Sequence, residues 1–400
     1  MLAFCCRFPL KHLLYCLLGL LPALPAAAQA TLRGTVRDSL TRQPLPFASV
    51  FLANTTRGTT ADAQGRYELT GVPAGRYELA ATYVGYQLRQ RPLVLAAGAQ
   101  QADLSLPPSA QQLGEVVVRP NPHREADYQR FLELLLGTST LARQCRVRNP
   151  DAVLVDYDGE RRVLTATASH PLEIDNPALG YRLTLYDLEF RADFADEGMT
   201  VTSLSHLAFK ELSGGAGRQR RWAANRARAY AGSFMHFLRS AYANTVAAEG
   251  FEVQRLRRVP NRRRAAADSI RQAIYASGQL GMQAVPDSIW RLLQQPRTYA
   301  YLYAPLLPPA SYRQASGSRV LLRFPDLLAV TYLRGRPDAN YHQLSLTLTP
   351  GRELASVLHL RQSAGAEVDA SGTLTQPLDL LTEGYWGFQK LGDLLPLDYK

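Results

Sequence analysis

Residues 32–86 read LRGTVRDSLTRQPLPFASVFLANTTRGTTADAQGRYELTGVPAGRYELAATYVGY. Apolar and polar residues alternate in short runs, and turn residues such as Pro44, Pro46 and Pro73 separate these runs. The strand signals recur about every 8–12 residues, which is a spacing typical of an antiparallel β-sandwich. The alternation predicts inward-facing side chains at Val36, Val50, Leu52, Tyr67, Leu69, Tyr77, Leu79 and Val84.

Five motifs follow one another in this part of the chain: GTVRD, PLPFASV, TTADAQGRYEL, VPAGRYEL and YVGY. In this order they resemble the carboxypeptidase-regulatory-like domain, a family that implies a seven-stranded, transthyretin-like β-sandwich over residues 31–107. QQLGEVVVRP at 111–120 also resembles the connector that follows this domain in TonB-dependent transporters of Gram-negative outer membranes. Because only 280 residues follow Pro120, we expect neither the plug nor the large barrel of those transporters.

The first thirty residues have the pattern of a secretion signal. Arg7 and Lys11 precede the apolar run LLYCLLGLL at 13–21, and the small residues Ala28 and Ala30 form a cleavage pattern. The apolar run is short for a membrane-spanning helix, although a retained anchor is the alternative. We therefore expect an exported protein, in the periplasm or associated with the outer membrane of a Gram-negative bacterium, without a transmembrane helix after signal removal.

Positive charge is concentrated in one part of the sequence. The chain has 45 basic and 34 acidic residues, and twelve arginines lie between 218 and 264. Since export excludes nucleic acid as a partner, we expect contact with lipid phosphate, an acidic glycan or an envelope protein with an acidic surface. A solvated helix face and a charged loop are the alternative. The candidate anion-contacting surface consists of Arg257, Arg258, Arg262, Arg263 and Arg264.

The second region has both helix and strand signals. Apolar spacing predicts a helix over 126–140 that stops near Gly137, and a long helix over 220–250 that a Gly232-Ser233 pair could split. Residues 261–318 are predicted to be irregular, with short helices near 268–277 and 286–294. The predicted fold class is mainly β, α+β: a signal peptide (1–30), the β-sandwich (31–107), a linker (108–122) and a separate α+β domain of unknown function (123–400).

Catalytic signatures are weak. His170 and Glu173 have the HxxE spacing of two zinc ligands in carboxypeptidases, but a catalytic zinc needs a third protein ligand and a carboxylate base. The spacing selects none of the remaining candidates, which are His206, His236, His342 and His359 as ligands and Glu353 or Glu383 as base. We expect no catalytic residue, no cofactor and no metal, with His170 and Glu173 as the only weak metal candidates.

Two further residues have a structural and a chemical interpretation. His236 follows Ser233 by three residues, but we expect a hydrogen-bonded core or interface histidine rather than a base beside a nucleophile. Cys145 is the only cysteine outside the first thirty residues, so it can form no internal disulfide. We expect it to be a small buried core residue.

The second region also resembles the uncharacterised C-terminal part of exported proteins that have the same N-terminal sandwich. PLEIDNPALGYRLTLYDLEF (171–190), RRWAANRARAYAGSFMHFLRS (220–240) and GYWGFQKLGDLLP (384–396) are the segments that resemble it. This resemblance supplies no activity. The sequence favours a non-enzymatic exported binding or assembly protein of the envelope. A zinc-dependent carboxypeptidase-like hydrolase and a component associated with outer-membrane transport are the alternatives.

Overall fold

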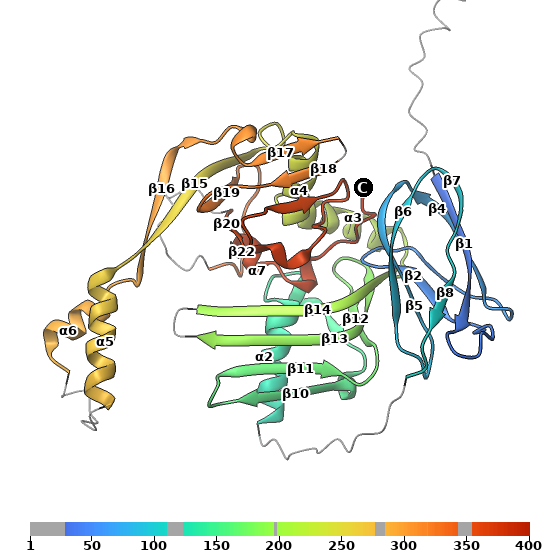
Figure 1. Ribbon diagram of the computed structural model, residues 1–400, viewed down its shortest axis with the longest axis horizontal. Helices are drawn as coiled ribbons and strands as arrows, with labels where there is room; N and C mark the ends of the chain where they lie inside the picture. Colours follow the sequence, from blue (N-terminus) through green and yellow to red (C-terminus); the bar gives the residue numbers. More distant parts are fainter. Residues whose placement is uncertain (1–28, 110–122, 196–197, 277–284, 318, 343–353) are drawn as a thin grey trace, which may run out of the picture.

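The computed structural model describes residues 29–109, 123–195, 198–276, 285–317, 319–342 and 354–400 (Figure 1). Residues 1–28 of the predicted signal peptide (1–30) and most of the predicted linker lie outside these residues, whereas Gln29 and Ala30, the last two residues of that predicted peptide, begin strand β1. The described chain is mostly β-structure, with several helices, and it begins with a β-sandwich. No helix among the described residues combines the length and the apolar character needed to cross a membrane.

The N-terminal sandwich consists of two sheets. In the first, β1 (Gln29–Asp38) lies between β4 (Arg66–Pro73) and the pair β7 (Gly98–Gln101) and β8 (Leu104–Leu106). The second sheet has the order β3 (Gly58–Thr60), β2 (Ser49–Leu52), β5 (Gly75–Thr82), β6 (Arg89–Leu95). Buried and accessible residues alternate along the whole of β1, as the sequence predicted. The shared core includes Leu32, Val36, Val50, Leu52 and Leu79.

The prediction of an inward-facing side chain is wrong for Val84 and is met only in part by Tyr77. Val84 is 92% exposed, because β5 ends at Thr82 and the chain then turns through Gly85, whose φ is +81°. Alternation of burial requires a strand, so it stops where the strand stops. Tyr77 is half-buried at the border of the core. The other six predicted residues are buried.

The second region begins with helix α2 (Arg124–Leu136) packed on a six-stranded sheet. The sheet has the order β10 (Val153–Asp158), β11 (Val163–Ala168), β13 (Tyr181–Ala195), β12 (Leu172–Asn176), β9 (Arg146–Val147), and β14 (Gly198–Glu211) pairs with β13. Phe131 of α2 meets Phe190 of β13 edge to face at 5.0 Å. The helix ends at Leu136, and Gly137, with φ +92°, forms the predicted stop.

A five-stranded sheet follows, in the order β16 (Thr298–Leu306), β15 (Phe251–Pro260), β19 (Leu327–Tyr332), β20 (Ala355–Leu360), β22 (Leu380–Gly384). A small sheet has the order β17 (Arg313–Ser316), β18 (Arg319–Leu322), β21 (Ala366–Val368). Both sheets share one hydrophobic core, which includes Leu322, Leu328 and Leu358 and which we call the second core. Helix α7 (Tyr385–Phe388) follows β22 directly. Short 3-10 turns lie at Ala142–Gln144, Pro150–Ala152, Pro309–Ser311, Pro377–Asp379 and Leu391–Asp393. The prediction of an irregular 261–318 is wrong for β16, whose sequence TYAYLYAPL forms a regular strand on β15.

The predicted long helix over 220–250 is two helices. Helix α3 (Ala216–Tyr230) ends before Gly232, which has φ +76°, and α4 (Phe234–Ala243) begins after Ser233. The Ser233 Oγ accepts a hydrogen bond from the His236 N–H at 3.1 Å, so Ser233 caps α4. Asn244 in the left-handed conformation ends α4, seven residues before β15 begins at Phe251. The predicted end at Gly250 is therefore wrong.

The sandwich is packed against the second region. The rings of Phe51 and Tyr186 stack at 4.9 Å, and the loop after β2 forms main-chain hydrogen bonds to β14. The buried carboxylate of Asp398 lies 3.2 Å from the Arg57 guanidinium and accepts a hydrogen bond from the Thr56 N–H. The division of the chain into two separate domains stays a prediction.

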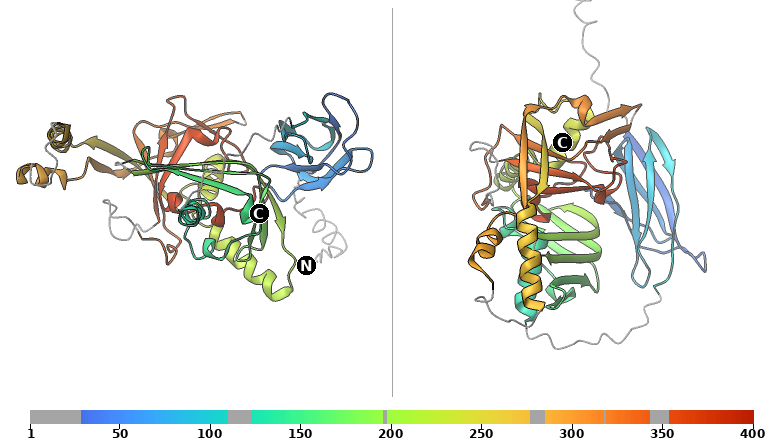
Figure 2. Two further views of the ribbon diagram at one scale, coloured as in Figure 1. Left: turned by 90° about the horizontal axis from the view of Figure 1, so that it is seen from below. Right: turned by 60° about the vertical axis from the view of Figure 1, so that its left-hand side comes forward.

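The hairpin of β15 and β16 extends beyond the five-stranded sheet, and α5 (Arg262–Ala276) and α6 (Asp287–Leu293) stand at its far end (Figures 1 and 2). We call residues 257–276 and 285–303 the arm. Figure 2 shows that the arm projects from the body on the side opposite to the sandwich. This projection contains all five arginines of the predicted anion-contacting surface, Arg257, Arg258, Arg262, Arg263 and Arg264.

Candidate functional site

The helices at the tip of the arm bury few of their described residues. Helix α6 has no buried residue, and α5 buries only Arg264 and Ala267. Exposed apolar side chains remain on α5, including Ile270 and Tyr275. Exposed apolar side chains on helices with few buried residues are typical of surfaces that contact another protein or a membrane.

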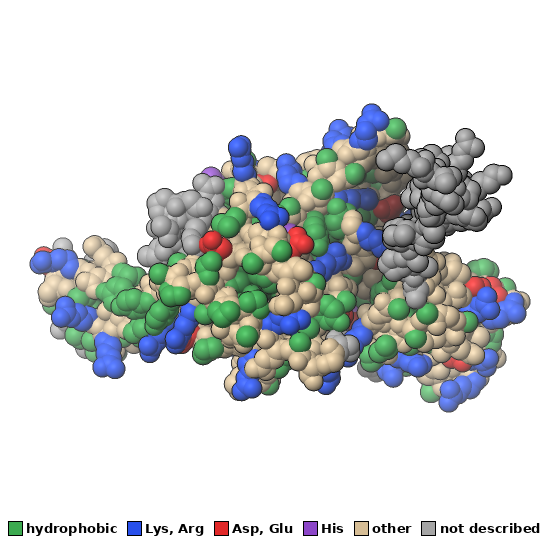
Figure 3. All heavy atoms as spheres, turned by 90° about the horizontal axis from the view of Figure 1, so that it is seen from above, with side chains coloured by type: hydrophobic (Ala, Val, Ile, Leu, Met, Phe, Trp, Pro, Cys, Tyr) green, Lys and Arg blue, Asp and Glu red, His purple; other side chains and the backbone are tan. Residues whose placement is uncertain are grey.

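A row of tyrosines lies on one face of the hairpin. The register pairs Tyr301 with Arg257 and Tyr299 with Val259, so these side chains share a face. Tyr301 is 54% exposed, and Tyr299 and Tyr303 are also exposed. The Arg255 guanidinium lies 4.9 Å from the centre of the Tyr303 ring and is paired with Asp326. In Figure 3, hydrophobic side chains and arginines gather together over the arm, at the left of the view.

The five predicted anion-contacting arginines divide into two groups. Arg257, Arg262 and Arg263 are exposed. Arg258 forms a bidentate pair with Glu383, with nitrogen–oxygen distances of 2.9 and 2.6 Å. Arg264 is buried, and its Nη1 lies 3.1 Å from the Asp268 carboxylate. The accessible basic surface is thus smaller than predicted, because the sequence does not show which arginines meet an internal carboxylate.

Arg258, His359 and Glu383 form one cluster, contributed by β15, β20 and β22. The His359 Nε2 lies 2.5 Å from a Glu383 carboxylate oxygen. Burial disfavours ionisation of Glu383, but hydrogen bonds from His359 and Arg258 outweigh burial and lower the pKa of Glu383 to about 2. Two of the residues considered for zinc therefore meet, but a guanidinium already neutralises the carboxylate and would repel a metal cation.

The HxxE pair is placed differently. His170 is exposed just before β12, and its Nδ1 lies 3.0 Å from the Ser169 hydroxyl. The Glu173 carboxylate lies 3.6 Å from Arg148 and 3.9 Å from Arg182. Among the residues that the structure describes, no group of three histidines, cysteines or carboxylates could hold a metal ion. Glu353 lies outside the described residues.

His236 is a buried, hydrogen-bonded core residue, as the sequence predicted. Its Nδ1 accepts a hydrogen bond from the Gly232 N–H at 3.1 Å, and its ring packs on Tyr230 and Phe251. Burial lowers the pKa of His236. Cys145 is half-buried beside the hydrophobic core between α2 and the six-stranded sheet, and burial raises the pKa of its thiol to about 12. Neither side chain has the environment of an activated catalytic group.

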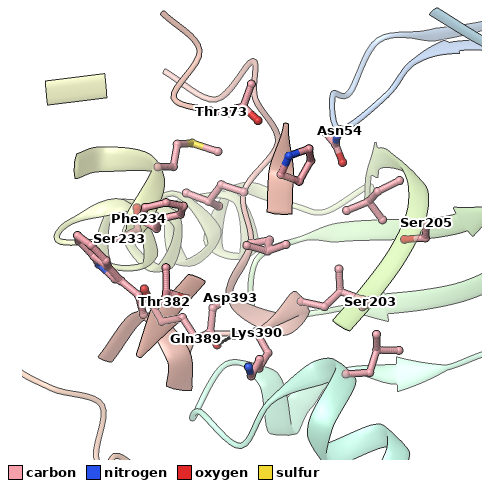
Figure 4. A pocket seen from close by; sticks show the side chains of 18 of the residues that line it. Asn54, Ser203, Ser205, Ser233, Phe234, Thr373, Thr382, Gln389, Lys390 and Asp393 are labelled. Atoms are coloured by element: carbon pink, nitrogen blue, oxygen red, sulfur yellow. Dashed lines mark hydrogen bonds between the residues drawn. The ribbon is translucent and has the colours of Figure 1, made fainter. Parts of the chain in front are cut away.

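The structure also contains a cavity of about 520 Å³ (Figure 4), a size within the range of ligand-binding pockets. Apolar side chains form most of its wall, among them Leu135, Leu207, Phe234, Trp386 and Leu395. Figure 4 shows Ser203 and Ser205 of β14 on one side, and Thr382, Gln389, Lys390 and Asp393 of the C-terminal segment on the other. Sequence reasoning missed the cavity because its wall comes from segments far apart in the chain, from Asn54 to Leu397.

Two ionisable side chains line the described part of this cavity. Burial raises the pKa of Asp393 to about 6, although the Ser139 hydroxyl donates a hydrogen bond to its carboxylate at 2.6 Å. Burial also lowers the pKa of Lys390. No histidine or cysteine is among the described lining residues. The mainly apolar wall suits binding of an apolar group.

The sandwich is the part of the chain that matches a known family. Residues 32–118 match the CarboxypepD_reg-like domain. A TonB-dependent receptor, P39 of Formosa agariphila, is 36% identical to this chain over 93 residues, which are 23% of this chain and 8% of that receptor. The chain thus spans a small fraction of this curated relative, and the likeness covers the CarboxypepD_reg-like domain region.

Comparison with solved structures gives matches with low TM-scores. A 5-hydroxyisourate hydrolase from Klebsiella pneumoniae is 24% identical with a TM-score of 0.17, and the match covers 20% of this chain and 90% of that chain. A putative carbohydrate-binding protein from Bacteroides uniformis is 13% identical with a TM-score of 0.18, over 48% of this chain and 80% of that one. A putative membrane-associated protein from Bacteroides fragilis is 12% identical with a TM-score of 0.18, and the match covers 47% of this chain and 100% of that chain.

Proposed function

We propose that this protein is a non-enzymatic binding or assembly protein of the Gram-negative cell envelope, and that its arm contacts a phosphate-bearing lipid surface. The observation that carries the proposal is the arm, a projection that exposes tyrosines and arginines together and buries little of its own surface. The CarboxypepD_reg-like domain would serve as the docking module on the other side of the body.

Envelope placement is supported by two features of the sequence. The signal-like pattern in residues 1–30 indicates export. The CarboxypepD_reg-like domain and the likeness to a TonB-dependent receptor associate the first folded unit with outer-membrane proteins. An envelope protein meets anionic lipid headgroups, so a basic projection has a plausible target in this compartment.

Charge and aromatic content support a lipid surface as the target of the arm. The arm contains eight arginines and two aspartates, an excess of six positive charges. Each basic residue near an anionic membrane contributes about 1 kcal/mol to binding, and the attraction weakens with salt. Tyrosine suits the headgroup level, because its ring is apolar and its hydroxyl is polar.

Vesicle co-sedimentation tests the proposal with the signal-cleaved full chain. We expect binding to vesicles of phosphatidylglycerol and phosphatidylcholine, with affinity that falls as NaCl rises, and little binding to phosphatidylcholine alone. The triple change Arg257→Gln, Arg262→Gln, Arg263→Gln should weaken binding at least tenfold, because about three charge contacts are lost. Tyr301→Ser should weaken binding while leaving its salt dependence unchanged.

A control variant with the same loss of charge is available on α3. Arg218, Arg220 and Arg221 are also exposed, so their change to glutamine removes three charges at a distance from the arm. This control should bind vesicles within threefold of the wild type. Equal weakening by both triple variants would show a nonspecific charge effect, and unchanged binding of the arm variant would reject the arm as the contact element.

A further inference from the structure

Strand β14 has a free edge along part of its length. On one side, β14 pairs with β13: His206 lies opposite Tyr186, and Leu204 lies opposite Glu189. The main-chain groups of the even-numbered residues of β14 face β13. On its other side, the Leu207 carbonyl accepts a hydrogen bond from the Asn54 N–H, and the Phe209 N–H donates to the Thr55 carbonyl. Main-chain groups alternate between the two edges of a strand, so Val201, Ser203 and Ser205 also face outward.

These outward groups form no main-chain hydrogen bond with any residue that the structure describes. The free stretch from Val201 to Ser205 is about 17 Å long at about 3.4 Å per residue. Ser203 is exposed and its neighbours are exposed or half-buried. Donors and acceptors are therefore available to another strand.

The usual protection of an edge strand is absent from this stretch. Residues 198–207 read GMTVTSLSHL and contain no proline, lysine, arginine or carboxylate. Natural proteins commonly place charges or prolines on exposed edges to prevent pairing with other chains. The uncharged edge of β14 therefore leaves pairing with another strand unopposed.

The cavity runs along the same edge. Val201, Ser203 and Ser205 line it together with Leu207 and Phe209, the two residues that already pair with the sandwich. Thr382 of β22, the edge strand of the five-stranded sheet, lies on the opposite side (Figure 4). The open stretch is thus continuous with an existing main-chain interface and is flanked by an apolar pocket of about 520 Å³.

We propose that the β14 edge from Val201 to Ser205 binds an extended, uncharged polypeptide segment of a partner protein by addition of a strand. Main-chain hydrogen bonds would supply affinity, as Asn54 and Thr55 supply them one step further along the edge. Alternate side chains of the peptide would enter the cavity, whose wall favours small or apolar groups. This site is separate from the arm and does not depend on the proposed lipid contact.

Ser203→Pro tests whether the free main-chain edge of β14 itself binds the peptide. The Ser203 N–H faces outward, so Ser203→Pro removes a donor from the free edge and leaves the ladder to β13 intact. Ser203→Thr keeps the donor and serves as the matched control. Fluorescence of Trp222, Trp290 and Trp386, which all lie in the second region, checks that both variants unfold with urea like the wild type.

Random decapeptides displayed on phage provide the probe, selected against the signal-cleaved full chain. We expect enriched peptides with alternating apolar residues and little charge. Ser203→Pro should weaken their binding at least tenfold, Ser203→Thr less than twofold, and N-methylation of alternate peptide residues should abolish binding. Vesicle binding by the arm should be the same in all three proteins, so failure here is distinguishable from failure of the lipid contact.

Three results would overturn the proposal. Selection could enrich no peptide, or the enriched peptides could bind Ser203→Pro as tightly as the wild type. Light scattering could also show a homodimer that Ser203→Pro converts to a monomer, which would make a second copy of this chain the occupant of the edge.

Discussion

Two carboxylates ten residues apart show how neighbours set acidity. Glu383 and Asp393 both lose hydration, which by itself raises a carboxyl pKa. Glu383 is held by Arg258 and His359, so its pKa falls to about 2. Asp393 has a hydroxyl and a main-chain N–H as hydrogen-bond donors, and its pKa rises to about 6. A cationic partner therefore decides the sign of the shift.

The Asp393 carboxylate should make the fold more stable in acid. Its folded pKa of about 6 lies above the ordinary 3.8, so the folded state holds the proton more tightly, and this stabilisation is lost as pH rises from 3.8 through 6. Asp393→Asn should therefore raise the free energy of unfolding at pH 7 by about 1–3 kcal/mol and change it little near pH 4. Asparagine keeps an oxygen for the Ser139 hydroxyl.

Urea unfolding followed by tryptophan fluorescence at pH 4 and pH 7 measures this difference. Asp151→Asn, at an exposed position, is the control and should leave both values within about 0.5 kcal/mol of the wild type. A variant less stable than the wild type at pH 7 would show that the ionised form of Asp393 is needed by the fold.

At the scale of elements, one glycine separates two helices. Gly232 has φ +76°, and a Cβ there would approach the Tyr332 ring to 2.5 Å. Its carbonyl accepts a hydrogen bond from the Trp386 indole at 2.8 Å, and its N–H donates to His236. The turn therefore fixes α4 against the second core, where Phe237 and Trp386 pack at 5.1 Å.

Gly232→Ala should destabilise the second region by about 2–4 kcal/mol, because a left-handed backbone and an overpacked ring both oppose the added methyl group. Gly217→Ala is the matched control: Gly217 lies in α3 with nothing within 4 Å of its added Cβ, so the change should be neutral or stabilise by about 0.5 kcal/mol. Tryptophan-detected urea unfolding compares the two. Equal stability of both variants would contradict the role assigned to this turn.

At the scale of the whole molecule, the C-terminal tail joins the two regions. The Leu397 N–H donates to the Asn54 carbonyl, and Asp398 binds Thr56 and Arg57 of the sandwich. Arg239 of α4 donates to the carbonyls of Leu397 and Tyr399, so the tail is held from both sides. The last residues therefore act as a bridge between the sandwich and α4.

Asp398→Ala should open the loop after β2 without unfolding the sandwich or the second region. The change leaves the Thr56 N–H and the Arg57 guanidinium without the buried carboxylate, at a cost of about 1–3 kcal/mol. Amide hydrogen exchange over residues 50–57 should rise about tenfold to a hundredfold, while exchange in β13 stays unchanged.

Asp62→Ala is the control for this experiment, because Asp62 lies on the sandwich and pairs with Arg66 within its own turn. Its exchange over residues 50–57 should match the wild type. Unchanged exchange in Asp398→Ala would mean that the stacked rings of Phe51 and Tyr186 suffice to hold the interface.

The sequence by itself determined what depends on local spacing: the sandwich strands, the buried His236, the stop at Gly137 and the basic character of residues 257–264. Period and turn chemistry act within a few residues, so one chain shows them directly. Only the tertiary structure decided which arginines remain accessible, that TYAYLYAPL pairs with β15, and that β14 keeps a free edge beside a cavity. Those features depend on contacts between residues that lie more than three hundred positions apart in some cases, such as Asn54 with Leu397, and local patterns contain no information on such contacts.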